Sequence, residues 1–200
     1  MTVYPLIRIL FAIPLGVLLW WLLRRKSRKM RGLISITAVI LAFSVLLCMP
    51  IENAFYSFKT PEQAFRYQNG GSAKIIHVED GENASAVVCF ARGDFSTAGF
   101  CRDANGYNLH NYFSPAFNAI PFVNVSQQAR GILLRSTRGT ESFIIVESKL
   151  EVKTISDSSG SEFHLSTHGT RNVFSAQIFD LMDDYLLYVN GEKITVFRWW

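Results

Sequence analysis

Three residues near the middle of the chain have the chemical types that covalent catalysis uses: Cys101, His110 and Asp103. A cysteine thiolate attacks an acyl carbon when a histidine accepts its proton and a carboxylate orients that histidine. These residue types also meet by chance, and no Gly-x-Ser-x-Gly elbow in its strand-turn-helix context supplies another nucleophile. A Cys/His hydrolase is therefore an alternative hypothesis, with these three residues as its candidate catalytic group.

Cys89 and Cys101 have a second possible chemistry, a disulfide. A turn centred near Phe95 would place them opposite each other on neighbouring strands, and such pairs are bonded in oxidising compartments. Closing a loop of this size is worth about 3 kcal/mol in the chain-entropy model. Two buried thiols are equally compatible with a β core. The sequence leaves both states open.

The four histidines, His77, His110, His164 and His168, form no metal-binding pattern in the sequence. On a strand, His164 and His168 would share one face but lie about 13 Å apart, too far for a common ion. The chain has no His-Glu-x-x-His motif, no paired-cysteine zinc motif and no phosphate-binding glycine loop. We therefore expect no metal site and no cofactor.

Any such site must be positioned by a chain that begins with two long apolar runs. Residues 6–23 contain a single charge, Arg8, and residues 33–49 contain none. At about 1.5 Å rise per residue, each run is long enough for a hydrocarbon core of about 30 Å. No small-x-small cleavage site follows the second run. Both runs are therefore predicted to be retained as membrane spans.

The connection between the runs carries six cations and no acid: Arg24, Arg25, Lys26, Arg28, Lys29 and Arg31. Short basic loops stay on the cytoplasmic side of a membrane. We predict that residues 1–50 form a transmembrane helical hairpin, with spans over about 6–23 and 33–49 and a cytoplasmic loop over 24–31. The protein would be a two-span cell-membrane protein with both termini extracytoplasmic.

The formal net charge of +4 comes from this anchor. All 16 acids and 13 of the 20 lysines and arginines lie from Ile51 onward, which leaves that region with a net charge of −3. Nucleic-acid binding requires cations clustered on the folded domain. The charge distribution therefore excludes a nucleic-acid partner. The first partner that we expect is the lipid bilayer.

Residues 51–200 are predicted to form one extracytoplasmic, β-rich domain. Thr60, Pro61 and Gln63 have the types and spacing of a helix start, which predicts one short helix ending before residues 69–71. Asn190-Gly191 predicts a type I′ turn that pairs Leu187 with Ile194 and Tyr185 with Val196. Further strands are expected over residues 74–78, 85–91, 95–102, 144–153 and 172–182. The strand over 144–153 is expected to have one solvated face.

The predicted fold class is a membrane-anchored α+β chain: an N-terminal two-helix transmembrane hairpin followed by a mainly antiparallel β domain with one short helix. The leading functional hypothesis is a non-enzymatic domain that binds a membrane or envelope protein, as an accessory subunit of an envelope complex or a toxin-protective factor. A tethered domain gains effective concentration for partners in the same membrane. The alternatives are the hydrolase and a sensor for a small extracellular ligand. Trp199 and Trp200 are the candidate contacts to a partner or to the membrane.

Overall fold

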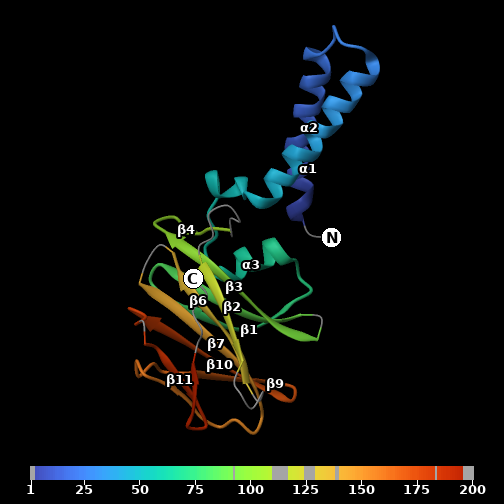
Figure 1. Ribbon diagram of the computed structural model, residues 1–200. Coiled ribbons are helices and arrows are strands. Elements are labelled where there is room, and N and C mark those ends of the chain that lie inside the picture. The colour runs from blue at the N-terminus through green and yellow to red at the C-terminus, as the bar shows by residue number, and fades with distance from the viewer. Residues whose placement is uncertain are drawn as a thin grey trace.

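Helices form the N-terminal quarter of the chain, and antiparallel strands form most of the rest (Figure 1). The computed structural model describes residues 3–91, 93–109, 117–123, 129–137, 140–182 and 184–195. The mainly antiparallel β character predicted from the sequence is confirmed.

Two long helices, α1 (Val3–Leu22) and α2 (Arg28–Cys48), lie side by side. Ser27 begins α2 as its N-cap, because its Oγ accepts a hydrogen bond from the backbone N–H of Met30. By length and composition, the 19-residue segment Arg28–Leu46 is able to cross a membrane. The described apolar part of α1, Ile9–Leu22, is shorter.

A short 3-10 helix, η1 (Ile51–Ala54), and the helix α3 (Pro61–Asn69) connect this pair to the strands. The predicted start of α3 is confirmed: the Oγ1 of Thr60 accepts from the N–H of Gln63, and Pro61 is the first helical residue. Phe65 lies on the buried face of α3, against the first sheet.

The strands form three antiparallel sheets. The first has the order β1-β2-β3-β4, with bounds Lys74–Asp80, Ala84–Ala91, Asp94–Asp103 and Gly106–Tyr107. The second has the order β5-β6-β7-β10-β9, with bounds Phe117–Val123, Ala129–Ser136, Glu141–Lys149, Arg171–Phe179 and His164–His168. The third has the order β12-β11-β8, with bounds Glu192–Thr195, Leu186–Val189 and Ile155–Asp157.

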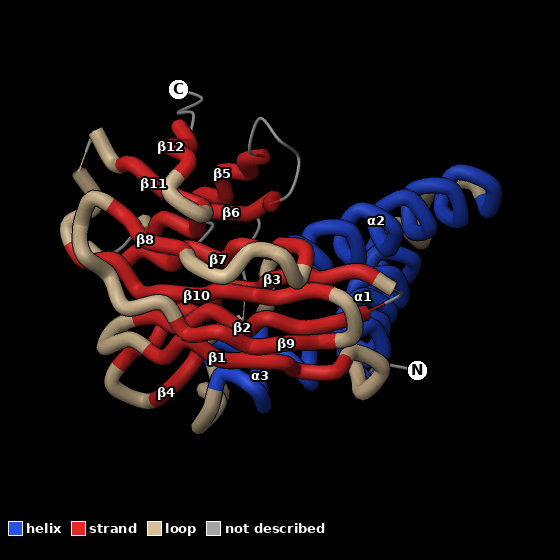
Figure 2. Tube along the Cα trace, turned by 90° about the horizontal axis from the view of Figure 1, so that it is seen from below, coloured by secondary structure: helices blue, strands red, loops and turns tan. Residues whose placement is uncertain are grey.

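These elements stack in four layers: α3, the first sheet, the second sheet and the third sheet (Figure 2). Each gap between layers holds its own apolar cluster. Phe100 lies between α3 and the first sheet, Phe143 between the first and second sheets, and Leu187 between the second and third. The second sheet is therefore covered on both faces.

This double cover corrects one prediction. The strand expected over residues 144–153 is β7, and it ends at Lys149. Its predicted solvated face is wrong, because residues 141–148 are all buried, Glu147 included. β7 is the central strand of the middle sheet, and the face that carries Ile145 and Glu147, which was expected to be solvated, lies against the first sheet.

The two other late predictions fit the structure better. Residues 171–179 form the strand β10, as favoured for the ambiguous segment 172–182. Asn190 and Gly191 both have positive φ, 50° and 83°, and Leu187 pairs with Ile194 as predicted. The expected pairing of Tyr185 with Val196 lies outside the described residues.

Candidate functional site

The structure does not assemble Cys101 and Asp103 as a catalytic pair. Cys101 is buried between the first and second sheets. Asp103 is exposed at the β3–β4 turn, where Oδ1 accepts from the N–H groups of Asn105 and Gly106 and Oδ2 from the side-chain amide of Asn108. These bonds, that from Asn108 above all, lower the pKa of Asp103. Its carboxylate therefore shapes a turn, and His110 lies outside the described residues.

Cys89 and Cys101 are not joined in a disulfide, so that alternative is wrong in this structure. The pairing of β2 with β3 ends at Ala91 and Asp94, where a turn near Phe95 was expected. Cys89 therefore pairs with Ser96, and Cys101 pairs with Ala84. Five positions along a strand correspond to about 16 Å and to opposite faces of the sheet. Cys89 accordingly contacts the layer of α3, and Cys101 contacts the second sheet.

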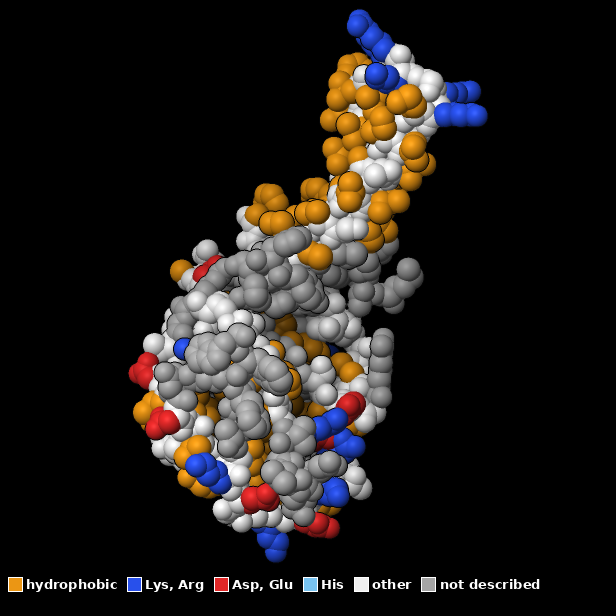
Figure 3. All heavy atoms as spheres, viewed as in Figure 1, with side chains coloured by type: hydrophobic (Ala, Val, Ile, Leu, Met, Phe, Trp, Pro, Cys, Tyr) orange, Lys and Arg blue, Asp and Glu red, His pale blue; other side chains and the backbone are white. Residues whose placement is uncertain are grey.

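The six cations of residues 24–31 gather at the end of the helix pair that is remote from the strands (Figure 3). Arg24 lies over the ring of Trp21 at 5.5 Å, and Arg31 over the ring of Trp20 at 5.1 Å. Such contacts hold aromatic rings and cations together at one level of the helix pair. Trp199 and Trp200, the predicted contacts to a partner or to the membrane, lie outside the described residues.

The helix pair exposes its large apolar side chains along its length (Figure 3). Leu10 and Leu33 are each 69% exposed. Among the side chains of the pair whose burial the structure describes, the buried ones are small: Ala12, Gly16 and Ser35. A Cβ atom on Gly16 would lie 2.4 Å from a methyl group of Val39, so the helices approach closely there.

A polar cluster lies inside the β domain, where β1 of the first sheet faces β9 and β10 of the second. It consists of His77 and Glu79 on β1, His164 on β9 and Ser175 on β10. A β-bulge between Ile75 and His77 shifts the register of β1 against β2. Ile75 therefore packs toward α3, while His77 and Glu79 point toward the second sheet.

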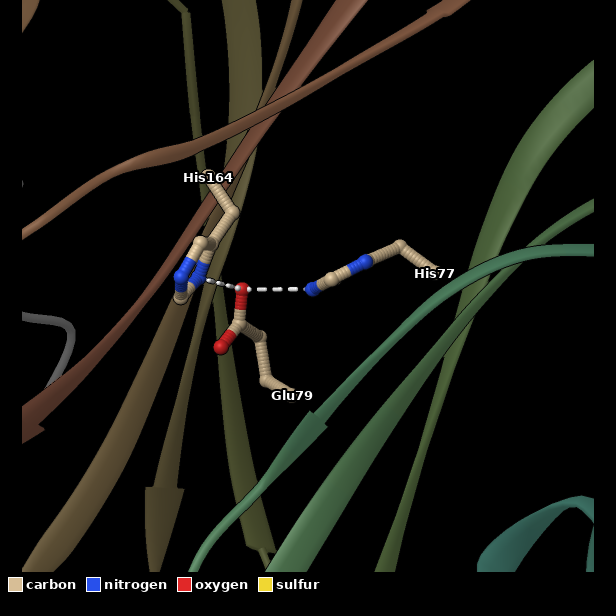
Figure 4. A group of neighbouring side chains, drawn as sticks. All are labelled: His77, Glu79 and His164. Atoms are coloured by element: carbon tan, nitrogen blue, oxygen red, sulfur yellow. Dashed lines mark hydrogen bonds and ion pairs between the residues drawn. The ribbon is translucent and has the colours of Figure 1, made fainter.

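One oxygen of Glu79 is the centre of this cluster (Figure 4). Its Oε1 lies 3.0 Å from Nε2 of His77, 3.0 Å from Nδ1 of His164 and 2.5 Å from Oγ of Ser175. The Glu79 side chain is 6% exposed, whereas the side chains of His77 and His164 are 29% and 56% exposed. The cluster thus consists of one buried carboxylate and two imidazoles that are exposed to solvent to different extents. Those groups can exchange protons or bind a cation.

One feature of the sequence could have predicted part of this cluster. His77 and Glu79 alternate on a strand, which places both on one face. His164 is 85 positions from Glu79 in the chain, and only the packing of two sheets brings them together.

Comparisons with protein-family models, with curated proteins and with solved structures give no match for this chain.

Proposed function

We propose that this chain is a membrane-anchored, non-enzymatic domain that binds a protein partner on the extracytoplasmic side of a cell membrane. The observation that carries the proposal is the inverted packing of the helix pair, with large apolar side chains outside and small ones inside. Helices that associate in lipid have this arrangement, because lipid tails cover the outer side chains and small residues let the backbones approach.

Both helices have the length of a span. α1 has 20 residues and α2 has 21, about 30 Å each at 1.5 Å per residue. In this proposal α1 and α2 form a transmembrane hairpin, and the basic loop at its tip stays in the cytoplasm. The β domain lies at the opposite end of the pair (Figure 1). With the loop in the cytoplasm, we propose that the domain and both termini are extracytoplasmic.

Binding is favoured over hydrolysis because of the state of the candidate catalytic residues. Cys101 is 7% exposed, and the carboxylate of Asp103 is used by its own turn. A domain held at a membrane meets other membrane proteins at a raised effective concentration, which favours a partner in the same membrane. The partner we propose is therefore a membrane or envelope protein.

Co-purification from native membranes tests this function. The full chain, affinity-tagged and solubilised in mild detergent, is compared with a variant whose residues 1–50 are replaced by an unrelated two-span hairpin of the same orientation. A membrane protein retained by both, at constant stoichiometry, supports binding through the domain. Cys101→Ala and Asp103→Asn should retain it as well. Loss of the protein's cellular phenotype in a folded Cys101→Ala variant would instead support the hydrolase.

A further inference from the structure

We propose that His77, Glu79 and His164 bind one divalent transition-metal ion of the zinc class, and that Ser175 orients the carboxylate that binds it. This metal site is independent of the partner proposed above and of how the chain lies in the membrane. It also departs from the expectation, drawn from the sequence, that the chain binds no metal.

The donor atoms define the class of ion. Two imidazole nitrogens and one carboxylate oxygen suit zinc, copper, nickel, cobalt and ferrous iron, whereas calcium and magnesium prefer oxygen ligands throughout. Three protein ligands also leave a coordination position open. His164 is more than half exposed, so water or a small anion can reach that position.

The distances fit such an ion. The three donor atoms lie within 4.8 Å of one another, and Glu79 Oε1 is 3.0 Å from both nitrogens. In a tetrahedral site with bonds of about 2.0 to 2.1 Å, neighbouring donors lie about 3.3 Å apart. Small movements of the two partly exposed histidines would therefore seat the ion among the three side chains.

Ser175 supplies the support that metal ligands need. Its hydroxyl donates to Glu79 Oε1 at 2.5 Å and is buried, so it fixes the carboxylate. Ser175 also pairs directly with His164 across β10 and β9. Hydrogen bonds to a ligating carboxylate orient it and are typical of metal sites.

Two other buried glutamates show why this cluster differs from a structural ion pair. Glu147 is held by Arg130 and Arg171, which stay charged and have no lone pair for a metal. Glu141 accepts backbone N–H groups of residues 82 and 83. Glu79, by contrast, is paired with two side chains that are themselves metal ligands.

The site would join two edge strands. β1 is the edge of the first sheet and β9 the edge of the second, so an ion bound to His77, Glu79 and His164 ties the sheets together where each ends. Binding of the ion should therefore stabilise the folded domain, because the unfolded chain does not hold the three ligands together.

Zinc titration of the full chain tests the proposal. The protein carries a tag without histidines, is stripped with EDTA in detergent micelles, and is titrated with ZnCl₂ or MgCl₂ by calorimetry and thermal unfolding. We expect one zinc per chain, a raised Tm with zinc and no binding of magnesium. X-ray absorption at the zinc edge should show two imidazole ligands.

The matched variants are His164→Ala and His168→Ala, on the same face of β9. His164 reaches Glu79, whereas His168 lies against Phe90 with ring centroids 4.6 Å apart. We expect His164→Ala to weaken zinc binding at least about 100-fold, His168→Ala to leave it unchanged, and Ser175→Ala to weaken it about 10- to 100-fold. No zinc binding by the folded wild-type chain, or equal losses in both histidine variants, would overturn the proposal.

Discussion

The helix pair and the β domain use the same apolar residue types in opposite ways. In the domain the large side chains are inside, with Phe143 and Leu187 fully buried. In the helix pair they are outside, and Ala12 and Gly16 fill the contact between the helices. The domain therefore covers its own large apolar side chains, whereas the helix pair leaves them exposed, as the proposed lipid anchor requires.

Truncating one large apolar side chain in each region gives the largest expected contrast. Phe143→Ala leaves a cavity between the first and second sheets and should lower the free energy of unfolding of the domain by about 3–5 kcal/mol. Leu41→Ala removes a side chain that is 61% exposed on α2, and should change it by less than about 0.5 kcal/mol. Urea unfolding of the full chain in non-ionic detergent measures both. Similar losses would show that the helix pair is part of the domain's core.

The two helical glycines test the close packing between α1 and α2. Gly16→Ala places a methyl group against Val39 and should weaken the helix pair by about 1–3 kcal/mol. Gly32→Ala meets only Trp20, at an ordinary contact of 3.5 Å, and is the matched control.

SDS titration of the micelles, followed by the emission of Trp20 with the other tryptophans changed to Phe, measures the separation of the helices. Trp20 lines the groove between them, so its surroundings change when they part. Equal midpoints for the two variants would contradict the close approach at Gly16.

The smallest expected contrast is in the alkylation of Cys48 and Cys89. Cys48 ends α2 half-buried, whereas Cys89 is in the core of the domain. Burial raises the pKa of the Cys89 thiol, and only the thiolate reacts with alkylating reagents.

At pH 8 we therefore expect Cys89 to be alkylated at least about tenfold more slowly in the folded protein than in urea. Because the folded pKa of Cys89 is the higher one, the protection that comes from the pKa persists as the pH rises past the unfolded pKa and is lost only as the pH rises through the folded pKa. Peptide mass spectrometry follows each cysteine, with Cys48 as the reference. Equal rates for Cys89 in both states would contradict its burial.

Features set by a few neighbouring residues could be predicted from the sequence. Thr60 and Pro61 fix the start of α3 through one hydrogen bond and one preset φ. Asn190 and Gly191 fix the last turn, because its geometry needs positive φ at both positions. In each case the physical cause lies within the motif itself.

Features set by distant segments could not be predicted in this way. A turn centred two to three residues earlier than expected moves the partner of Cys89 by five positions, and the proposed disulfide is lost. The first sheet covers the face of β7 that carries Ile145 and Glu147 and so removes its expected solvated face. The cluster around Glu79 needs both a bulge at residues 75–77 and a histidine from another sheet.

Cysteine accessibility in intact cells directly tests the orientation proposed for the helix pair and the β domain. Cys48, Cys89 and Cys101 are changed to Ala, and one exposed position receives the probe, by Lys26→Cys in the basic loop or Ser159→Cys on the domain. A membrane-impermeant maleimide should label the Ser159→Cys variant in intact cells, and the Lys26→Cys variant only after the membrane is opened. The reverse pattern, or labelling of both in sealed cells, would contradict a cytoplasmic loop and an extracytoplasmic domain.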